Sequence, residues 1–499
     1  MSNIAVFGTA SDVGKSTIAA AFCRILHQRG ERVLPFKAQN MSNNAGVGLP
    51  HSAEGASLGE MGRAQIVQAW AAGADPHVDM NPVLLKPASN TRSQVVVLGE
   101  AQGDQEAAAY FKDTGRLRAI AYTALDRLRA RADRIVLEGA GSCAEVNLRR
   151  TDFVNFDAAH HADARVILVA DIDRGGVFAQ VLGTLACLDA RDRERVAGVI
   201  VNRFRGDATL FDDGVRWLTE RTGLPVYGVV PWLRRMDLES EDSLPADVAV
   251  DPRSWQTGCV RVGIVRLPRI ANFTDALTLS RFPETIQPAF FTDPALADGC
   301  DLLIVPGSKN TRADLRWLHE TGWSALIRDR VVRDRAVIGI CGGYQMLGVE
   351  VCDPEGVEDA AGTTPGVGVL DARTVFEAQK QVRTAAGSLL LQTETVPVSG
   401  YEIHVGRTES MHAPAVMLKT GTTDQADGAR RSDRLWGTYL HGVLDEPRTL
   451  HAVLAPLRPD VDLSALQHAP SAFEARESAL NRLARHVCDS VDVDGAIGN

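Results

Sequence analysis

Short apolar runs separated by helical stretches constrain the fold of this 499-residue chain more than any other feature. Six such runs recur in the first half, at residues 4–7, 32–35, 134–137, 165–169, 196–201 and 226–229. Strands without polar alternation are buried on both faces, and intervening helices supply the cover. The pattern therefore predicts a parallel, doubly wound α/β sheet.

A second α/β series starts at residues 260–265 and continues through 302–305 and 336–340 to the region of His441. The chain between the two series is acidic and punctuated by proline, without a strand or helix period, which is typical of a linker. After the second series, apolar residues recur at helical spacing. We therefore expect two doubly wound parallel-sheet domains at 1–233 and 260–448, a linker at 234–259 and a helical extension at 449–499.

Charge and cysteine content exclude several classes of protein. The chain carries 53 basic and 63 acidic residues, a net charge of −10, without long runs of either sign, so no nucleic-acid footprint is present. Its eight cysteines form no Cys-x-x-Cys pair, which indicates a reducing compartment and argues against structural zinc. The chain begins with an apolar strand, and no apolar span of membrane length follows. We expect a cytoplasmic protein without a nucleic-acid or membrane partner, and the oligomeric state stays open.

Cys341 lies between glycines directly after an apolar run. Gly339 and Gly343 permit a tight strand-to-helix turn, and the positive end of the following helix favours a nucleophilic thiolate. Further along, His441 ends another apolar run, where it can serve as a general base. A buried, inert cysteine and a structural histidine are the alternatives. The glycines and the histidine together favour a Cys–His acyl-transfer site.

The segments around Cys341 and His441, together with residues 301–311, resemble the class I (triad) glutamine amidotransferase domain. In that family the cysteine attacks the side-chain amide of glutamine, a glutamyl thioester forms and ammonia is released. The resemblance implies glutamine as the nitrogen donor. It also implies an oxyanion hole built from these residues: Gly307, Ser308 and Gly343.

One position departs from this family pattern. Most members carry a glutamate two residues after the histidine, and Val443 stands there in this chain. The departure resembles the branch of cobyric acid synthases and cobyrinic acid diamide synthases. Glu402 is a candidate for the third member of the triad, and a structural or substrate-binding role fits this residue equally well.

The first apolar run continues into a glycine-rich turn and a helix, as in phosphate-binding loops. Lys15 can reach the outer phosphates, and the hydroxyl of Ser16 or Thr17 can hold Mg²⁺. Five residues rather than four separate Gly8 from Gly14, a spacing that resembles the dethiobiotin synthetase type of ATP-binding domain, whose members activate carboxylates. The alternative is an adventitious glycine-rich turn. We expect ATP and Mg²⁺ as cofactors, with these nucleotide-binding residues: Gly8, Thr9, Gly14, Lys15, Ser16, Thr17 and Asn202.

Five residues extend this resemblance. Lys37 follows the second strand, where the family places a catalytic lysine beside the phosphates, although an exposed, solvated lysine is the alternative. Glu138 and Asp171 end strands at the carboxyl edge of the predicted sheet, so we expect both to join Ser16 as Mg²⁺ ligands. Either Asp171 or the neighbouring Asp173 can contact metal or substrate, and a helix-capping role fits Asp173 nearly as well. Asn202 resembles the family's adenine-recognising asparagine.

A carboxylate activator fused to an ammonia generator makes an amide: ATP gives an acyl phosphate, and ammonia released in the same polypeptide displaces phosphate. Residues 1 to about 445 resemble the cobyric acid synthase family, most specifically at 36–44, 80–87, 171–176 and 400–407. The resemblance implies a corrinoid polycarboxylate substrate. It implies amidation of adenosylcobyrinic acid a,c-diamide at its b, d, e and g carboxylates, within adenosylcobalamin synthesis.

Two other functions compete with this interpretation. An a,c-diamide synthase uses the same two chemistries on a different substrate, and a regulatory or partitioning ATPase uses a similar phosphate-binding loop. A polycarboxylate substrate also requires a local basic surface on this acidic chain. The candidates for that surface, with ordinary solvated charge as the alternative, are Lys86, Arg92, Arg174 and Arg205.

Overall fold

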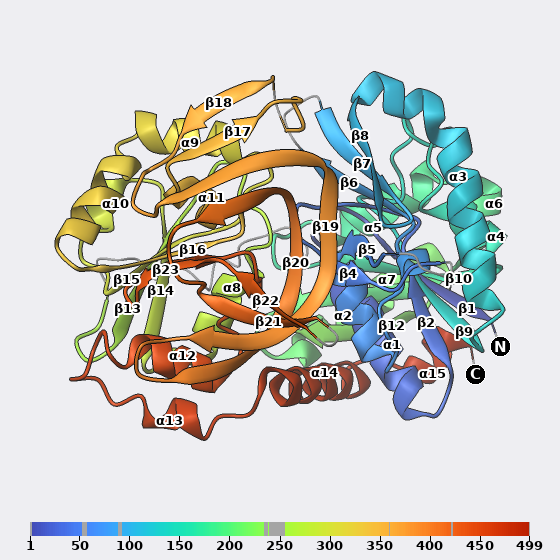
Figure 1. Cartoon of the computed structure of the whole chain (residues 1–499). Helices are drawn as coiled ribbons and strands as arrows, with labels where there is room; N and C mark the ends of the chain where they lie inside the picture. The colour runs from blue at the N-terminus through green and yellow to red at the C-terminus, as the bar shows by residue number, and fades with distance from the viewer. Residues whose placement is uncertain are drawn as a thin grey trace. The chain divides into compact units, whose positions relative to one another are not determined.

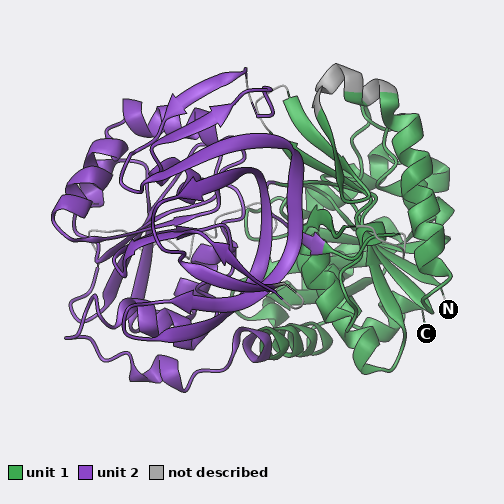
Figure 2. Cartoon of the chain, in the orientation of Figure 1, with its two compact units in different colours: residues 1–42, 48–241, 476–499 green, residues 43–47, 242–475 purple. Residues whose placement is uncertain are grey.

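A computed structural model describes residues 2–51, 57–87, 92–233, 238, 255–358, 360–420 and 423–498. The chain forms two compact units (Figures 1 and 2), one of residues 1–42, 48–241 and 476–499 and the other of residues 43–47 and 242–475. Most of the predicted linker, residues 234–259, lies outside the described residues. The domain boundaries expected from the sequence stay predictions.

A six-stranded parallel sheet forms the centre of the first unit, as predicted, in the order β12-β11-β10-β1-β9-β2. Its strands are β1 (Asn3–Gly8), β2 (Val33–Phe36), β9 (Arg134–Glu138), β10 (Ala164–Asp171), β11 (Val196–Phe204) and β12 (Val226–Pro231). Alternate residues of one strand enter different cores, because Phe7 packs on one face and Val6 on the other. Both faces are therefore buried, which explains the uninterrupted apolar runs.

Helices surround this sheet on both faces (Figure 1). They are α1 (Lys15–Gln28), α2 (Arg63–Ala71), α3 (Ala107–Arg129), α4 (Phe156–His161), α5 (Val177–Cys187), α6 (Ala190–Arg193) and α7 (Asp212–Thr222), with short 3-10 turns η1 (Val78–Met80) and η2 (Ala208–Phe211). A smaller sheet in the order β3-β6-β7-β8 was not expected from the sequence. It comprises β3 (Gln39–Met41), β6 (Val83–Pro87), β7 (Arg92–Val97) and β8 (Glu100–Glu106). A separate two-stranded sheet is formed by β4 (Ala45–Gly48) and β5 (Gly59–Gly62).

The end of the chain completes the core of the first unit. Leu480, Leu483 and Val487 of α14 (Ala472–Cys488) and Ile497 of α15 (Val493–Ile497) are buried in the same cluster as residues of β1 and α1. The guanidinium of Arg134 donates to the carbonyl oxygens of both Ser2, at 3.2 Å, and Ile497, at 2.9 Å. The two termini of the chain therefore lie next to each other (Figure 1).

The second unit contains another six-stranded sheet, in the order β14-β13-β15-β16-β24-β23. Its strands are β13 (Val260–Val265), β14 (Ile286–Phe291), β15 (Leu302–Val305), β16 (Ala336–Ile340), β23 (Ala429–Ser432) and β24 (Leu435–Thr438). The strands run parallel, as predicted, except β23, which pairs antiparallel at one edge. The accompanying helices are α8 (Thr274–Leu277), α9 (Thr311–Glu320), α10 (Trp323–Val332), α11 (Gly342–Leu347), α12 (Pro447–Leu454) and α13 (Ser464–Gln467), with 3-10 turns η4 (Thr278–Arg281) and η5 (Pro294–Leu296).

A third, largely antiparallel sheet was not anticipated. It comprises β17 (Glu350–Asp353), β18 (Gly362–Pro365), β19 (Ala372–Leu390), β20 (Thr395–Ser410), β21 (Val416–Thr420) and β22 (Thr423–Asp427). The strands β19 and β20 form a long curved hairpin that stands out in Figure 1. Among the described helices, none is both long enough and apolar enough to cross a membrane.

Candidate functional site

Neighbouring parallel strands of the second unit end at one edge of their sheet, in the order β13, β15, β16 and β24. The segments that leave these ends carry Asp275, Gly307, Cys341 and His441, respectively. In parallel α/β sheets, ligands bind at this carboxyl edge. The topology therefore brings together residues that are far apart in the sequence.

Cys341 occupies a strained turn between β16 and α11. Its φ is 53° and its ψ is −112°, a backbone conformation that residues other than glycine rarely adopt. A β-carbon on Gly343 would lie 1.8 Å from the carbonyl oxygen of Val305, and one on Gly339 would lie 2.7 Å from the backbone nitrogen of Tyr344. Both glycines are needed for this turn, which confirms the strand-to-helix turn expected from the sequence.

We expect the Gly343→Ala variant to lower the apparent Tm of the protein by at least about 6 °C. The added methyl group overlaps a backbone oxygen that cannot move aside, and overpacking of this kind costs about 3 kcal/mol or more. Gly183, inside α5, is the matched control, because no described atom lies within 4 Å of a β-carbon added there. Thermal unfolding should leave Gly183→Ala unchanged or slightly stabilised. Equal Tm values for the two variants would contradict this account.

His441 is fully buried, and its imidazole and the backbone of the next residue, Gly442, contact the same carboxylate. Its Nδ1 lies 2.7 Å from Asp275 Oδ2, while the backbone N–H of Gly442 donates to Asp275 Oδ1 at 2.6 Å. The ring of Tyr401 stacks on the imidazole with centroids 5.0 Å apart. Burial lowers the pKa of His441, but the Asp275 carboxylate, with Tyr401 and Cys341, outweighs burial and raises that pKa well above the ordinary value.

Gly307 shows how close the thiol and the imidazole are to a common point. A β-carbon on Gly307 would lie 3.2 Å from His441 Cε1 and 3.8 Å from Cys341 Cβ. The backbone nitrogen of Ser308 would lie 3.0 Å from a β-carbon on Gly342, at the start of α11. Two of the residues expected to form an oxyanion hole, Gly307 and Ser308, therefore lie beside the cysteine turn, and their role stays a prediction.

The carboxylate beside His441 comes from a residue that the sequence analysis missed. Glu402, the candidate from the sequence, is buried but pairs with Arg383. Val443, at the position where the family places a glutamate, is fully buried in the apolar core. Asp275 follows the first strand of the second sheet, so its place after a parallel strand was the signal that could have identified it.

In the first unit, Glu138 lies at the centre of a buried polar cluster. Its carboxylate accepts from Ser16 Oγ at 2.7 Å, from Lys37 Nζ at 2.9 Å and from the side chains of Gln65 and Gln68 on α2. Burial raises the pKa of Glu138, but Lys37, Ser16 and Gln68 more than offset burial and lower it. Glu138 is therefore a carboxylate at neutral pH, and Lys37 is a buried catalytic candidate rather than an exposed lysine.

The same cluster fits a magnesium ion. Hydroxyl and carboxylate oxygens are ligands that Mg²⁺ prefers, and Ser16 and Glu138 offer both within 3 Å of each other. The buried side-chain oxygen of Gln68 has no hydrogen-bond partner among the described residues. Asp171, the third expected ligand, ends β10, which β1 separates from β9 and Glu138. Its carboxylate accepts from Arg203 at 3.0 Å and from the backbone of Asp173.

The phosphate-binding loop lies between β1 and α1. Gly14 caps the helix with a φ of 95°, and Lys15 Nζ donates to the carbonyl oxygen of Ala10 at 3.0 Å. The side chain of Asn202 donates to the carbonyl oxygen of Val13 at 2.9 Å. A β-carbon on Gly14 would lie 2.1 Å from Asn202 Nδ2. Asn202 therefore supports the loop, while adenine recognition by this residue stays a prediction. The remaining expected residues of the loop, Gly8, Thr9 and Thr17, are in the strand, the turn and the helix.

The cationic residues proposed for substrate carboxylates differ in exposure. Lys86 is buried and pairs with Glu60, so it forms no part of an exposed basic surface. Arg174 is exposed and pairs with Asp12 at 3.3 Å. Arg205 pairs with Asp173 and lies over the ring of Trp232, with 3.8 Å between its guanidinium carbon and the ring centroid. The exposed arginines thus remain the candidates for contact with an anionic substrate.

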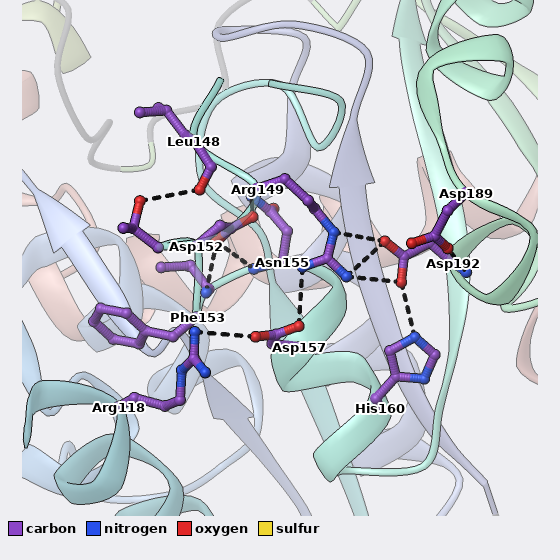
Figure 3. Close-up of polar contacts among 12 residues, drawn as sticks. Arg118, Leu148, Arg149, Asp152, Phe153, Asn155, Asp157, His160, Asp189 and Asp192 are labelled. Atoms are coloured by element: carbon purple, nitrogen blue, oxygen red, sulfur yellow. Dashed lines mark hydrogen bonds and ion pairs between the residues drawn. The ribbon is translucent and has the colours of Figure 1, made fainter. Parts of the chain in front are cut away.

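An ion-pair network fixes the loop that follows Glu138 (Figure 3). Arg149 Nε donates to the buried Asp192 at 2.7 Å. The side-chain amide of Asn155 forms hydrogen bonds of 3.1 Å with both the N–H and the carbonyl of Ala140. These contacts tie the start of the loop at Ala140 to its end at Asn155 and join the loop to Asp192.

Comparisons with known proteins cover both units. A CobQ/CobB/MinD/ParA nucleotide binding domain matches residues 4–245, and a CobB/CobQ-like glutamine amidotransferase domain matches residues 261–449. The cobyric acid synthase of Chlorobium phaeobacteroides (strain BS1) is 47% identical over 493 residues, which cover 97% of this chain and 96% of the relative. That of Chlorobaculum tepidum is 45% identical over 506 residues, covering 99% and 97%. A solved glutamine amidotransferase structure matches 40% of this chain and 98% of its own, with a TM-score of 0.31 and 21% identity.

Proposed function

The chain belongs to the cobyric acid synthase family, and we propose that it amidates the b, d, e and g carboxylates of adenosylcobyrinic acid a,c-diamide, using ATP and glutamine, to give adenosylcobyric acid. The observation that carries this proposal is the pairing of two sites in one chain. One unit holds a cysteine turn beside a His–Asp pair, and the other holds a phosphate-binding loop beside a buried Lys–Glu pair.

The second unit releases ammonia from glutamine. Cys341 Sγ attacks the side-chain amide carbon of glutamine, and His441 takes the thiol proton and transfers it to the leaving ammonia. Asp275 accepts from Nδ1 of the imidazole, so the proton transfers take place at Nε2. Backbone N–H groups of Ser308 and Gly343 stabilise the oxyanion. Water then hydrolyses the glutamyl thioester, which releases glutamate and restores the thiol.

The first unit activates the substrate carboxylate. A carboxylate oxygen attacks the γ-phosphorus of ATP, ADP leaves, and ammonia then displaces phosphate from the acyl phosphate to give the amide. Lys15 and Lys37 stabilise the negative charge on the transferring phosphoryl group. Mg²⁺, when bound, would neutralise phosphate charge, with Ser16 and Glu138 as its protein ligands.

All eight cysteines are free thiols, which supports our proposal of a cytoplasmic, reducing compartment.

A product assay tests this function. Purified protein is given ATP, Mg²⁺ and glutamine with either cobyrinic acid or adenosylcobyrinic acid a,c-diamide, and the products are identified by mass. We expect successive amidation of the a,c-diamide, with up to four additions, one at each of its b, d, e and g carboxylates. Amidation of cobyrinic acid to its a,c-diamide alone would assign the chain to the diamide synthases. Absence of glutamine hydrolysis would instead favour a regulatory ATPase.

We expect the Asp275→Asn variant to lose about 100-fold or more in kcat for glutamine hydrolysis. The amide has nearly the same shape but cannot stabilise the imidazolium, and it favours the wrong tautomer of His441. Glu402→Gln is the matched control, because it neutralises the other buried carboxylate that the sequence suggested for this role. It should keep glutaminase activity within about tenfold of the wild type. The opposite ranking of the two variants would show that Glu402 completes the triad.

A further inference from the structure

A short segment from the first half of the sequence contributes to the second unit. This segment, Asn43–Val47, begins shortly after Lys37 and belongs by its contacts to the unit that holds Cys341. The side chain of Asn44 accepts from the backbone N–H of Phe273 at 3.3 Å. The segment, here called the strap, thus holds the loop from which α8 and Asp275 follow.

Asn272 connects the strap to the general base. It is buried, its φ is 52°, and its side-chain oxygen accepts from the backbone N–H of Ala45 at 2.9 Å. Its side-chain nitrogen lies 3.4 Å from His441 Nε2. A backbone N–H can only donate, so Ala45 determines which end of the amide is the oxygen. The NH₂ group of Asn272 must therefore face the imidazole.

This orientation matters for the charge of the imidazole. A neutral His441 with its proton on Nδ1 can accept from Asn272 at Nε2, whereas an imidazolium would place a second N–H against the amide N–H. The thiol of Cys341, meanwhile, donates to the carbonyl oxygen of Ile403 at 3.6 Å, and a thiolate could not make that contact. Both contacts favour the uncharged forms of cysteine and histidine over the reactive thiolate–imidazolium pair.

We propose that Asn272 is a positioning residue that the strap holds in a restraining orientation, which disfavours the charged form of the Cys341–His441 pair until the strap moves. When Ala45 moves away, the amide of Asn272 is free to turn, and its oxygen then accepts from the imidazolium. The inference rests on the proposed glutaminase function. It adds a restraint on that activity, built from residues that take no part in the bond changes.

The other groups that face His441 act in different directions. Asp275 on α8 favours the imidazolium, as do Tyr401 on β20 and the Cys341 thiolate. His404, also on β20, has a pKa lowered to about 4 by burial and adds no positive charge near neutral pH. Asn272 therefore opposes a set of groups that otherwise favour the charged pair, and its removal should release their effect.

The test uses two substitutions at position 272 and measures glutamine hydrolysis without ATP or corrinoid. Asn272→Gly removes the amide, and glycine adopts a positive φ without strain. Asn272→Asp replaces the donor by an oxygen that can accept from the imidazolium. We expect both variants to raise kcat/KM at least about fivefold, because the contact that favours the uncharged pair is gone. In Asn272→Asp we also expect the acid limb of the pH profile to move to higher pH, because the added carboxylate stabilises the protonated imidazole.

Asp334→Gly is the matched control, since Asp334 is exposed in the same unit and has a φ of 54°. This variant should leave glutaminase activity and its pH profile unchanged. Asn44→Ala, which loosens the strap from Phe273, should raise basal hydrolysis about twofold or more. No rise in Asn44→Ala would overturn the role of the strap.

Folding is checked for each variant by circular dichroism and by ammonium-dependent amidation. Unchanged or lower basal hydrolysis in both folded variants at position 272, with an unmoved acid limb in Asn272→Asp, would overturn the proposal for Asn272. A wild-type enzyme that hydrolyses no glutamine would instead refute the proposed function itself, so the two failures are distinguishable.

Discussion

The Cys341→Ser variant is expected to lose glutamine-dependent amidation by at least about a thousandfold and to keep amidation supported by ammonium salts. A serine hydroxyl retains its proton near neutral pH, so the His441–Asp275 pair faces a much weaker nucleophile than the thiol. The first unit needs only ammonia, whatever its source, so activation of the substrate carboxylate continues. Product formation measured with each nitrogen source gives the two activities separately.

Cys300 provides the matched control in the same unit. Burial raises the pKa of its thiol, which makes it an inert cysteine of the core. Cys300→Ser should lower stability slightly and retain glutamine use. Loss of activity with both nitrogen sources in a folded Cys341→Ser protein would contradict the division of labour between the two units.

The Lys37→Met variant is expected to lose amidation by about a thousandfold with either nitrogen source while retaining glutamine hydrolysis. Methionine keeps the length and apolar stem of lysine but removes the charge beside the transferring phosphoryl group. It also leaves the buried Glu138 carboxylate without its cation, which raises the pKa of Glu138. ATP-dependent amide formation and glutamine hydrolysis are assayed on the same preparation, so that the activity of each unit is measured separately.

Arg24→Met serves as the control for removal of a buried cation. Arg24 lies on α1 of the same unit and pairs with Glu477 at 2.5 Å, away from the phosphate-binding loop. This variant should lower the apparent Tm but keep amidation within about tenfold. If both variants lost activity in proportion to their stability, Lys37 would have a structural role rather than a catalytic one.

The parallel sheets were predictable because their strands are buried on both faces, and the resulting apolar runs are visible in the sequence. The hairpin of β19 and β20 was not, since its strands have many exposed polar positions and no turn pair of the Asn-Gly kind. The strand β14 was also not predicted, because Gln287 and Pro288 interrupt its apolar run at the edge of the sheet. Strands of this kind are defined by their partners rather than by local sequence.

The candidate site also contains both residues that the local sequence predicts and residues that it does not. The surroundings of Cys341 and Lys15 were recognisable because tight turns and phosphate binding require particular residues at fixed spacing. Asp275 was not, because a buried aspartate has no local signature and meets His441 only through the order of strands in the sheet. Asn272 was missed for the same reason, since its partner Ala45 is distant in sequence.

The packing of α14 and α15 in the same core as β1 affects which fragments of the enzyme can fold and how the chain folds during synthesis. Cutting the chain between its two halves would strip the nucleotide-binding half of Leu480, Leu483 and Ile497, so that fragment would expose apolar surface and aggregate. Excising residues 242–475 and joining the flanking ends would preserve that packing instead. On the ribosome, the half that is synthesised first must wait for the last residues to emerge before its hydrophobic interior is complete.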